Sequence, residues 1–172
     1  YRVNLAGLRR VLEHCRGLKT CPKFLFTSSL AVFGAVENVD DHTATMPQSS
    51  YGTQKALGEL LVNDYSRKGF IDGRTLRLPT VVIRPGKPNA AASSFASGIL
   101  REPLAGEESI CPVSEDLALW IASPASVTNA LMHALDLPKD ALAPWRTVNV
   151  PGITVTVAQM VEALGRAGGD TS

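Results

Sequence analysis

The chain has 172 residues, of which 45% are hydrophobic and 19% are charged, and its formal net charge is +1 at pH 7. This composition is typical of a globular domain with a hydrophobic core, and the scattered Lys and Arg residues do not form the basic stripe of a nucleic-acid-binding protein. No apolar run reaches the roughly 18–20 residues that a membrane-spanning helix requires. We therefore expect partners other than nucleic acid or membrane.

The three cysteines, Cys15, Cys21 and Cys111, form no CxxC motif, and no His or Cys residues stand at the spacing of zinc ligands. An odd number of cysteines without such motifs favours reduced thiols over a disulfide framework. The sequence thus predicts a cytoplasmic protein without a metal site.

The first half of the chain alternates helical and extended patterns. Apolar residues recur at helical spacing over residues 3–17, and a short apolar run at 23–27 is typical of a strand buried on both faces. A polar, turn-rich stretch covers residues 34–50. An amphipathic helix is expected from Ser50 to a stop at Gly69.

The second half continues in the same way, apart from residues 102–123, which show no clear pattern. The expected elements are a buried strand at 74–86, a helix at 90–101, a Ser-capped helix at 123–137, a strand at 146–150 and a helix at 156–169. Strands that alternate with helices indicate an α/β fold with a parallel sheet.

Tyr51 and Lys55 stand four residues apart at the start of the expected helix, so their side chains lie on one face of it. A phenol with a pKa near about 10 is a poor base at neutral pH. A nearby ammonium favours the phenolate and lowers that pKa. The pair is therefore a candidate for proton transfer.

Two serines, Ser28 and Ser29, follow directly on the expected strand at 23–27. Turn formation alone explains many such pairs. In open α/β sheets, however, active sites lie beyond the carboxyl ends of the strands. A Tyr-Lys pair whose Tyr51 lies 22 residues after Ser29 makes a catalytic role the better interpretation.

Three segments in this order, FTSSLAVFG (26–34), PQSSYGTQK (47–55) and LRLPTVVIRPG (76–86), closely resemble the extended short-chain dehydrogenase/reductases, the NAD-dependent epimerase/dehydratase family. Residues 4–7, 120–124 and 148–152 extend the resemblance over essentially the whole chain. It implies a Rossmann-like, doubly wound parallel sheet with a small C-terminal substrate-binding part.

The resemblance also implies roles for individual residues. Tyr51 would exchange the proton, Ser29 would hydrogen-bond the reacting oxygen, and Lys55 would lower the pKa of Tyr51 and hold the nicotinamide ribose. Asn4 would support the proton relay or the cofactor. The residues expected to contact NAD, with NADP as the alternative, are Asn4, Thr27, Tyr51, Lys55, Leu78 and Pro79. Thr80 would face the substrate.

Two features depart from the family pattern. Phe33 replaces the usual Tyr of the turn after the serines, and none of the 14 glycines forms a GxxGxxG or GxGxxG phosphate-binding turn. Because that turn lies earlier in the family than the point where this chain begins, we expect an N-terminally truncated chain that is inactive by itself. The catalytic second half of the Rossmann-like domain would cover 1–86, and a mixed substrate-binding region with a late Rossmann strand and helix would cover 87–172. The full-length protein would be a homodimer.

Within the family, residues 87–107 resemble the branch of D-erythronate dehydrogenases, which oxidise a small sugar acid at C2. Ser29, Thr80, Ser93, Ser94 and Arg101 are the residues expected to bind this substrate, although Arg101 fits a solvated helix position equally well. Two alternatives remain open. One is an NDP-sugar epimerase or dehydratase, and the other is a non-catalytic fragment without the cofactor half.

Overall fold

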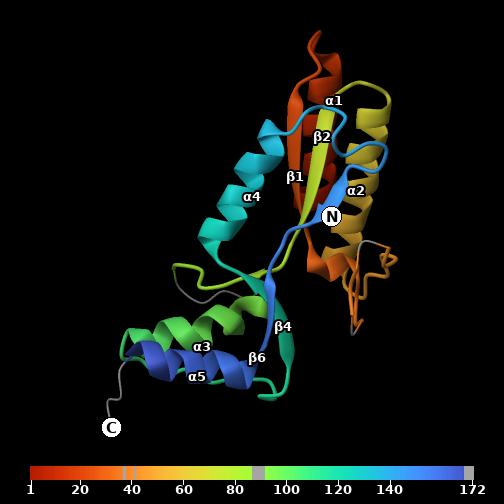
Figure 1. The fold of residues 1–172 in the computed structure, drawn as a ribbon. Coiled ribbons are helices and arrows are strands. Elements are labelled where there is room, and N and C mark those ends of the chain that lie inside the picture. Colours follow the sequence, from red (N-terminus) through yellow and green to blue (C-terminus); the bar gives the residue numbers. More distant parts are fainter. Residues whose placement is uncertain (37, 41, 87–91, 169–172) are drawn as a thin grey trace. The chain divides into compact units, whose positions relative to one another are not determined.

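The computed structural model describes residues 1–36, 38–40, 42–86 and 92–168 (Figure 1). Two compact units are present. Unit 1 consists of Tyr1–Leu78 and Thr128–Val150, and unit 2 consists of Pro79–Val127 and Pro151–Ser172. The two units are therefore interleaved along the chain, whereas the division expected from the sequence, 1–86 and 87–172, is continuous.

Unit 1 is built around a parallel sheet of three strands in the order β1-β2-β5. The strands are β1 (Lys23–Ser29), β2 (Asp72–Leu78) and β5 (Thr147–Asn149). The helices are η1 (Arg2–Gly7, a π-helix), α1 (Leu8–Gly17), η2 (Leu30–Val32, a 3-10 helix), α2 (Ser50–Arg67) and most of α4 (Pro124–Asp136). The expected strands at 23–27 and 146–150 and the expected helices from Ser50 and from 123 are thus confirmed.

Helices cover both faces of this sheet, as expected of a doubly wound fold. On one face, α1 and α2 enclose a core of Leu8, Leu12, Val62, Tyr65 and Ile71, to which Phe24 and Phe26 of β1 contribute. On the other face, α4 packs over Leu76, Val150 and Leu25. Phe24 and Phe26 share a face opposite that of Leu25 because successive side chains of a strand alternate.

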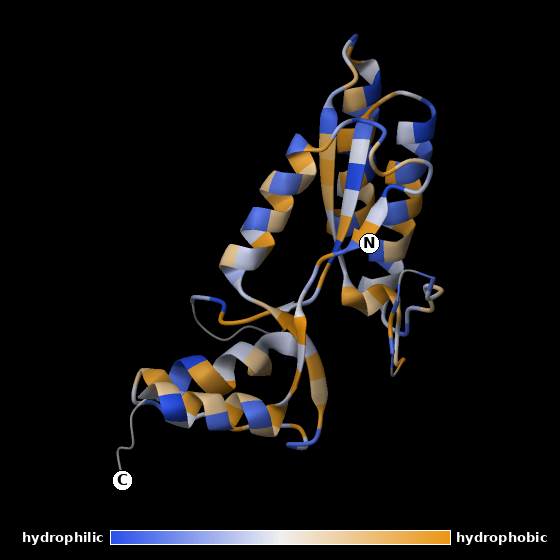
Figure 2. Ribbon diagram, viewed as in Figure 1, coloured by the Kyte–Doolittle hydropathy of each residue, from blue (hydrophilic) through white to orange (hydrophobic). Residues whose placement is uncertain are grey.

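Strand β1 is less buried than its sequence predicts. Lys23 and Thr27 are exposed, and Ser28 is the one buried residue of the strand. The expectation of a strand buried on both faces is wrong here because β1 pairs with β2 along one edge, and no other described strand pairs with it. The first six residues of β2 are buried instead, although Figure 2 shows hydrophilic residues within this strand.

A proline divides the strand that was expected over 74–86. Strand β2 ends at Leu78, and after Pro79 the chain enters β3 (Thr80–Val81), which belongs to a different sheet in unit 2. The expectation of one continuous strand is wrong because proline has no N–H to donate to a ladder and restricts the residue before it.

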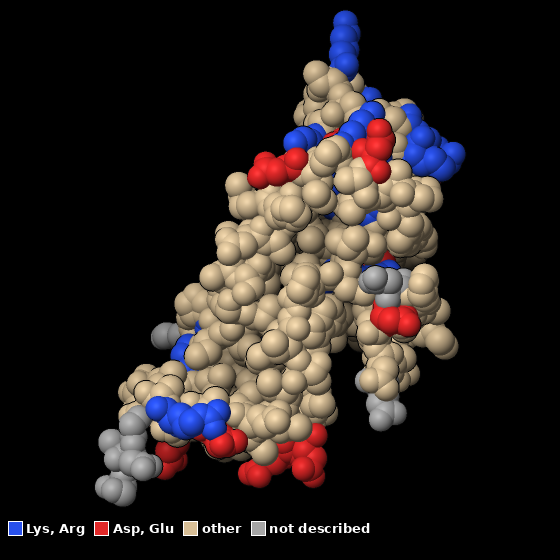
Figure 3. All heavy atoms as spheres, in the orientation of Figure 1, with Lys and Arg blue, Asp and Glu red and all other residues tan. Residues whose placement is uncertain are grey.

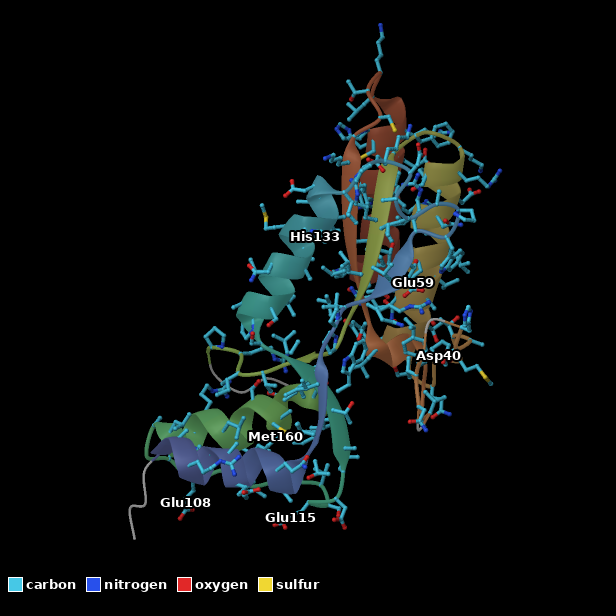
Figure 4. The ribbon with its side chains drawn as sticks, in the orientation of Figure 1. Asp40, Glu59, Glu108, Glu115, His133 and Met160 are labelled. Atoms are coloured by element: carbon cyan, nitrogen blue, oxygen red, sulfur yellow. The ribbon has the colours of Figure 1, made fainter. Side chains whose placement is uncertain are left out.

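Unit 2 contains a mixed sheet in the order β3-β4-β6, with β3–β4 parallel and β4–β6 antiparallel. Its remaining elements are η3 (Ala92–Ser94), α3 (Phe95–Leu104), β4 (Ala118–Ala122), β6 (Ile153–Thr156) and α5 (Val157–Gly168). Helices α3 and α5 meet in a core that includes Val82, Ile99 and Met160, the last labelled in Figure 4. Of the helix expected at 90–101, residues 90 and 91 lie outside the described residues.

Charges of both signs lie in small separate groups on the face drawn in Figure 3. Within the described ranges, no helix combines the length and the apolar character needed to cross a membrane.

Candidate active site

The start of α2 lies directly against the turn that follows β1. The side chain of Ser49 caps the helix by accepting a hydrogen bond from the Gly52 backbone N–H at 3.0 Å. A Cβ atom on Gly52 would lie 2.2 Å from the carbonyl oxygen of Ala31 in η2. Only glycine therefore permits this approach, which brings the first turn of α2 to the carboxyl end of β1.

Lys55 connects the helix to the strand. Its ammonium donates a hydrogen bond of 2.7 Å to the backbone carbonyl of Thr27, and its Nζ lies 5.5 Å from the centre of the Tyr51 ring. The same Nζ lies 5.0 Å from the centre of the Phe26 ring. Burial lowers the pKa of Lys55 below its ordinary value because desolvation disfavours the ammonium.

Tyr51 and Ser29 have the exposure that a reacting site requires. Tyr51 is 46% exposed, so this residue is open to solvent. Ser29 is half-buried, and its Oγ accepts a hydrogen bond of 3.2 Å from the Ala31 backbone N–H. The Ser29 hydroxyl hydrogen is thus left to donate to another oxygen.

A buried network, which the sequence analysis missed, lies beside these residues. Ser28 donates to Glu59 Oε1 at 2.5 Å, and Arg77 binds the same carboxylate through Nε at 2.9 Å and Nη2 at 2.7 Å. The Arg77 guanidinium lies 4.8 Å from the centre of the Phe33 ring. The sequence predicted an amphipathic helix and a buried strand here but not their connection, although a Glu and an Arg in these two elements could have indicated it.

The other predicted residues of unit 1 lie at its margins. Asn4 is exposed within η1, and Leu78 ends β2 and packs beside the core of Leu76, Ala134 and Val150. Their roles toward the cofactor stay predictions.

The remaining predicted residues belong to unit 2. Pro79 is buried, Thr80 lies in β3, and Ser93 and Ser94 lie in η3. The Arg101 guanidinium in α3 donates to the Arg84 carbonyl at 2.8 Å and forms an ion pair with Glu102. The sequence analysis left open whether Arg101 binds substrate or is only a solvent-exposed helix residue. These contacts show that it is not the latter.

An apolar hollow of about 800 Å³ lies on the opposite side of α2 from Tyr51 and Lys55. Its lining comes from the N-terminal helices and from α2, and includes Leu5, Ala6, Leu57, Leu60 and Leu61. Helical periodicity separates these α2 positions from the stripe that carries Tyr51 and Lys55. The hollow is thus distinct from the candidate active site.

The donor groups at the end of β1 fit the ribose of a nicotinamide nucleotide. An ammonium has three N–H donors, and the hydrogen bond of Lys55 to Thr27 uses one of them. The other two donors and the accessible Tyr51 hydroxyl match neighbouring hydroxyl groups. The residues present can therefore hold this part of the cofactor.

Comparisons with known proteins show which family this chain is similar to. The model of the NAD dependent epimerase/dehydratase family matches residues 1–134. D-Erythronate dehydrogenase from Haemophilus influenzae is 55% identical over 172 residues, which cover 99% of this chain and 55% of that protein. D-Erythronate dehydrogenase from Cupriavidus necator is 56% identical over 171 residues, which cover 98% of this chain and 53% of that protein. The chain thus spans about half the length of these curated relatives.

Solved structures show the same fold. A nucleoside-diphosphate-sugar epimerase from Agrobacterium tumefaciens has a TM-score of 0.91 and 48% identity, covering 98% of this chain and 52% of that one. The holo form of a GalE-like L-threonine dehydrogenase from Cupriavidus necator has a TM-score of 0.86 and 26% identity, covering 96% of this chain and 54% of that one.

Proposed function

Since the chain belongs to the NAD-dependent epimerase/dehydratase family, we propose that the full-length protein is an NAD-dependent dehydrogenase of a small sugar acid such as D-erythronate, with Tyr51 as the general base. One observation carries this proposal. The Lys55 ammonium contacts both the Tyr51 ring and the carbonyl of Thr27, and Thr27 lies two residues before Ser29 in the chain.

The residues of this chain supply the proton transfer. The Lys55 ammonium lies beside the Tyr51 ring, and Tyr51, acting as the general base, takes the proton of the substrate hydroxyl. Ser29 donates a hydrogen bond to the same oxygen and holds it during the reaction. As the carbonyl bond forms, the hydrogen on the carbinol carbon leaves as hydride. Bound NAD would supply the hydride acceptor.

Both the relatives and the chemistry of unit 2 support the choice of substrate. Two relatives named D-erythronate dehydrogenase are 55% and 56% identical over nearly the whole chain. Small hydroxyl-bearing residues, Thr80, Ser93 and Ser94, fit a polyhydroxy acid. A substrate carboxylate would compete with Glu102 for the Arg101 guanidinium.

A second candidate, an NDP-sugar epimerase, is favoured by the structure from Agrobacterium tumefaciens at 48% identity. A substrate screen separates the two functions. The full-length protein is given saturating NAD with four- to six-carbon aldonates and uronates, or with UDP- and dTDP-sugars. NADH absorbance detects oxidation, and NMR of the sugar detects epimerisation.

We expect NADH formation with D-erythronate at the highest kcat/KM of the set. A site that hydrogen-bonds a carboxylate and neighbouring hydroxyls discriminates strongly against compounds that lack them. Turnover confined to nucleotide sugars contradicts the assignment. Failure both to bind NAD and to convert any compound supports the third possibility, a non-catalytic protein.

A homodimeric state, a cytoplasmic location and the use of NAD rather than NADP are also part of this proposal. Sedimentation of the full-length protein, its localisation in the source cell and kcat/KM with each dinucleotide test them separately.

A further inference from the structure

We propose that Ser28, Glu59 and Arg77 form a positioning network, which sets the distance between the end of β1 and the Tyr51-Lys55 face of α2. This inference rests on the proposed function, because it concerns the geometry of the same site. It assigns no proton transfer to the network itself.

The three side chains meet because of strand register and helix period. Ser28 and Arg77 are direct partners in the β1–β2 ladder, so both side chains point to the face that α2 covers. Glu59 follows Lys55 by four residues and lies on the same stripe of the helix, at the place labelled in Figure 4. Glu59 therefore reaches both strands at once.

All three side chains are removed from water. Ser28 is 2% exposed, Glu59 is 1% exposed and Arg77 is 6% exposed. The Arg77 fork binds both oxygens of the carboxylate, and the planar guanidinium also lies over the buried Phe33 ring. A bidentate pair of this kind has a defined geometry, which is what a positioning element requires.

The hydrogen bond from Ser28 is the part that points to a role beyond stability. Arg77 alone balances the charge of Glu59, so the ion pair does not need the serine hydroxyl. The bond instead ties α2 to the residue that lies between Thr27, whose carbonyl binds Lys55, and Ser29. Two successive residues of β1 are thus held by two successive turns of α2.

Two anchors fix both the position and the rotation of the strand end, and the next residue is the predicted catalytic Ser29. Misplacement of reacting groups by about 1 Å can reduce turnover about 100-fold. Loss of one anchor should therefore act on catalysis and on the Tyr51-Lys55 pair, while the sheet itself persists through its ladder bonds.

The test uses Ser28→Ala in the full-length protein, with Ser28→Thr as the conservative variant. Ser66→Ala is the matched control. Ser66 is also a buried serine that connects α2 to β2, since its Oγ donates to Val62 at 2.6 Å and accepts from Gly73 at 3.1 Å. Its bonds lie at the far end of the helix from Tyr51.

Two readouts are measured for each variant. The first is kcat with the best substrate at saturating NAD. The second is the affinity for NADH, obtained without substrate from nicotinamide fluorescence. A role confined to stability changes the melting temperature and leaves both readouts unchanged.

We expect Ser28→Ala to reduce kcat about tenfold or more, and to weaken NADH binding severalfold because Lys55, which is proposed to hold the nicotinamide ribose, is held less firmly. Ser28→Thr should restore both readouts, and Ser66→Ala should change neither. If Ser28→Ala does not fold, Ser28→Cys, which has a similar volume and a weaker donor, takes its place.

An unchanged NADH affinity in folded Ser28→Ala overturns the inference, and so does an equal loss of affinity in Ser66→Ala. The NADH measurement needs no substrate. A wild-type protein that oxidises no hydroxy acid therefore refutes the proposed function, while the NADH affinity still decides the role of Ser28.

Discussion

A substitution at the contact between Gly52 and Ala31 is the most direct way to disturb the geometry of the site. In Gly52→Ala, the new Cβ would lie 2.2 Å from the Ala31 carbonyl oxygen and 3.1 Å from Pro47 Cβ. Such atoms do not approach within 3.0 Å in real structures, so the helix start must move by at least about 0.8 Å. Because the obstacle is backbone, no side-chain rotation relieves it.

Tyr51 is the neighbour of Gly52, so this movement displaces the proposed base from Ser29. A displacement near 1 Å reduces turnover by about 100-fold. We therefore expect Gly52→Ala to lower kcat/KM by one to two orders of magnitude, measured as NADH formation by the full-length protein. Gly165→Ala in α5 is the control, because nothing lies within 4 Å of its added Cβ. Full activity and unchanged melting of Gly52→Ala would refute the contact on which the site depends.

Three further predictions follow from the charged groups. Burial lowers the pKa of Lys55. The decrease of kcat/KM at alkaline pH should therefore begin at a lower pH than the ordinary pKa of lysine. In any activity that Lys55→Arg retains, this decrease should move to higher pH. Tyr65 donates to Glu13, and this bond lowers the pKa of the carboxyl. The stability that this bond contributes is present above the pKa of Glu13 in the unfolded chain, and it is lost as pH falls through the lowered pKa of the folded protein. Urea unfolding at several pH values should show a weaker pH dependence of stability in Tyr65→Phe. Asp72 pairs with two buried arginines, one of them Arg74, so Asp72→Asn should cost about 3–5 kcal/mol in urea unfolding, whereas unchanged stability would contradict the pairing.

Local sequence signals predicted much of unit 1. The helix expected from Ser50 begins at that residue, with Ser49 as its cap, and Ser123 caps α4 by accepting from the Ser126 N–H at 3.1 Å. These are local signals, in which a side chain satisfies a backbone group a few residues away. Tyr51 and Lys55 belong to the same class, since helix geometry alone places them together.

The parts that sequence reasoning missed depend on distant segments. Strands β4 and β6 pair with each other across more than 30 residues of chain. Arg77 lies in a strand that the sequence predicted to be buried, and its partner Glu59 is 18 residues away on a helix. Such pairs become visible only when the register of β1 and β2 is known. The end of the strand at Pro79 could have been predicted from the sequence, because proline has no N–H to donate to the hydrogen bonds between strands.

The central claim is that Tyr51 transfers the proton in an NAD-dependent oxidation. The most direct test compares wild-type full-length protein with Tyr51→Phe, in turnover of D-erythronate and in NADH binding followed by fluorescence. We predict that the variant retains NADH affinity within a few-fold and loses nearly all kcat, since phenylalanine keeps the ring and removes the only group that accepts the proton. Retention of more than a few per cent of the wild-type kcat would contradict the assignment.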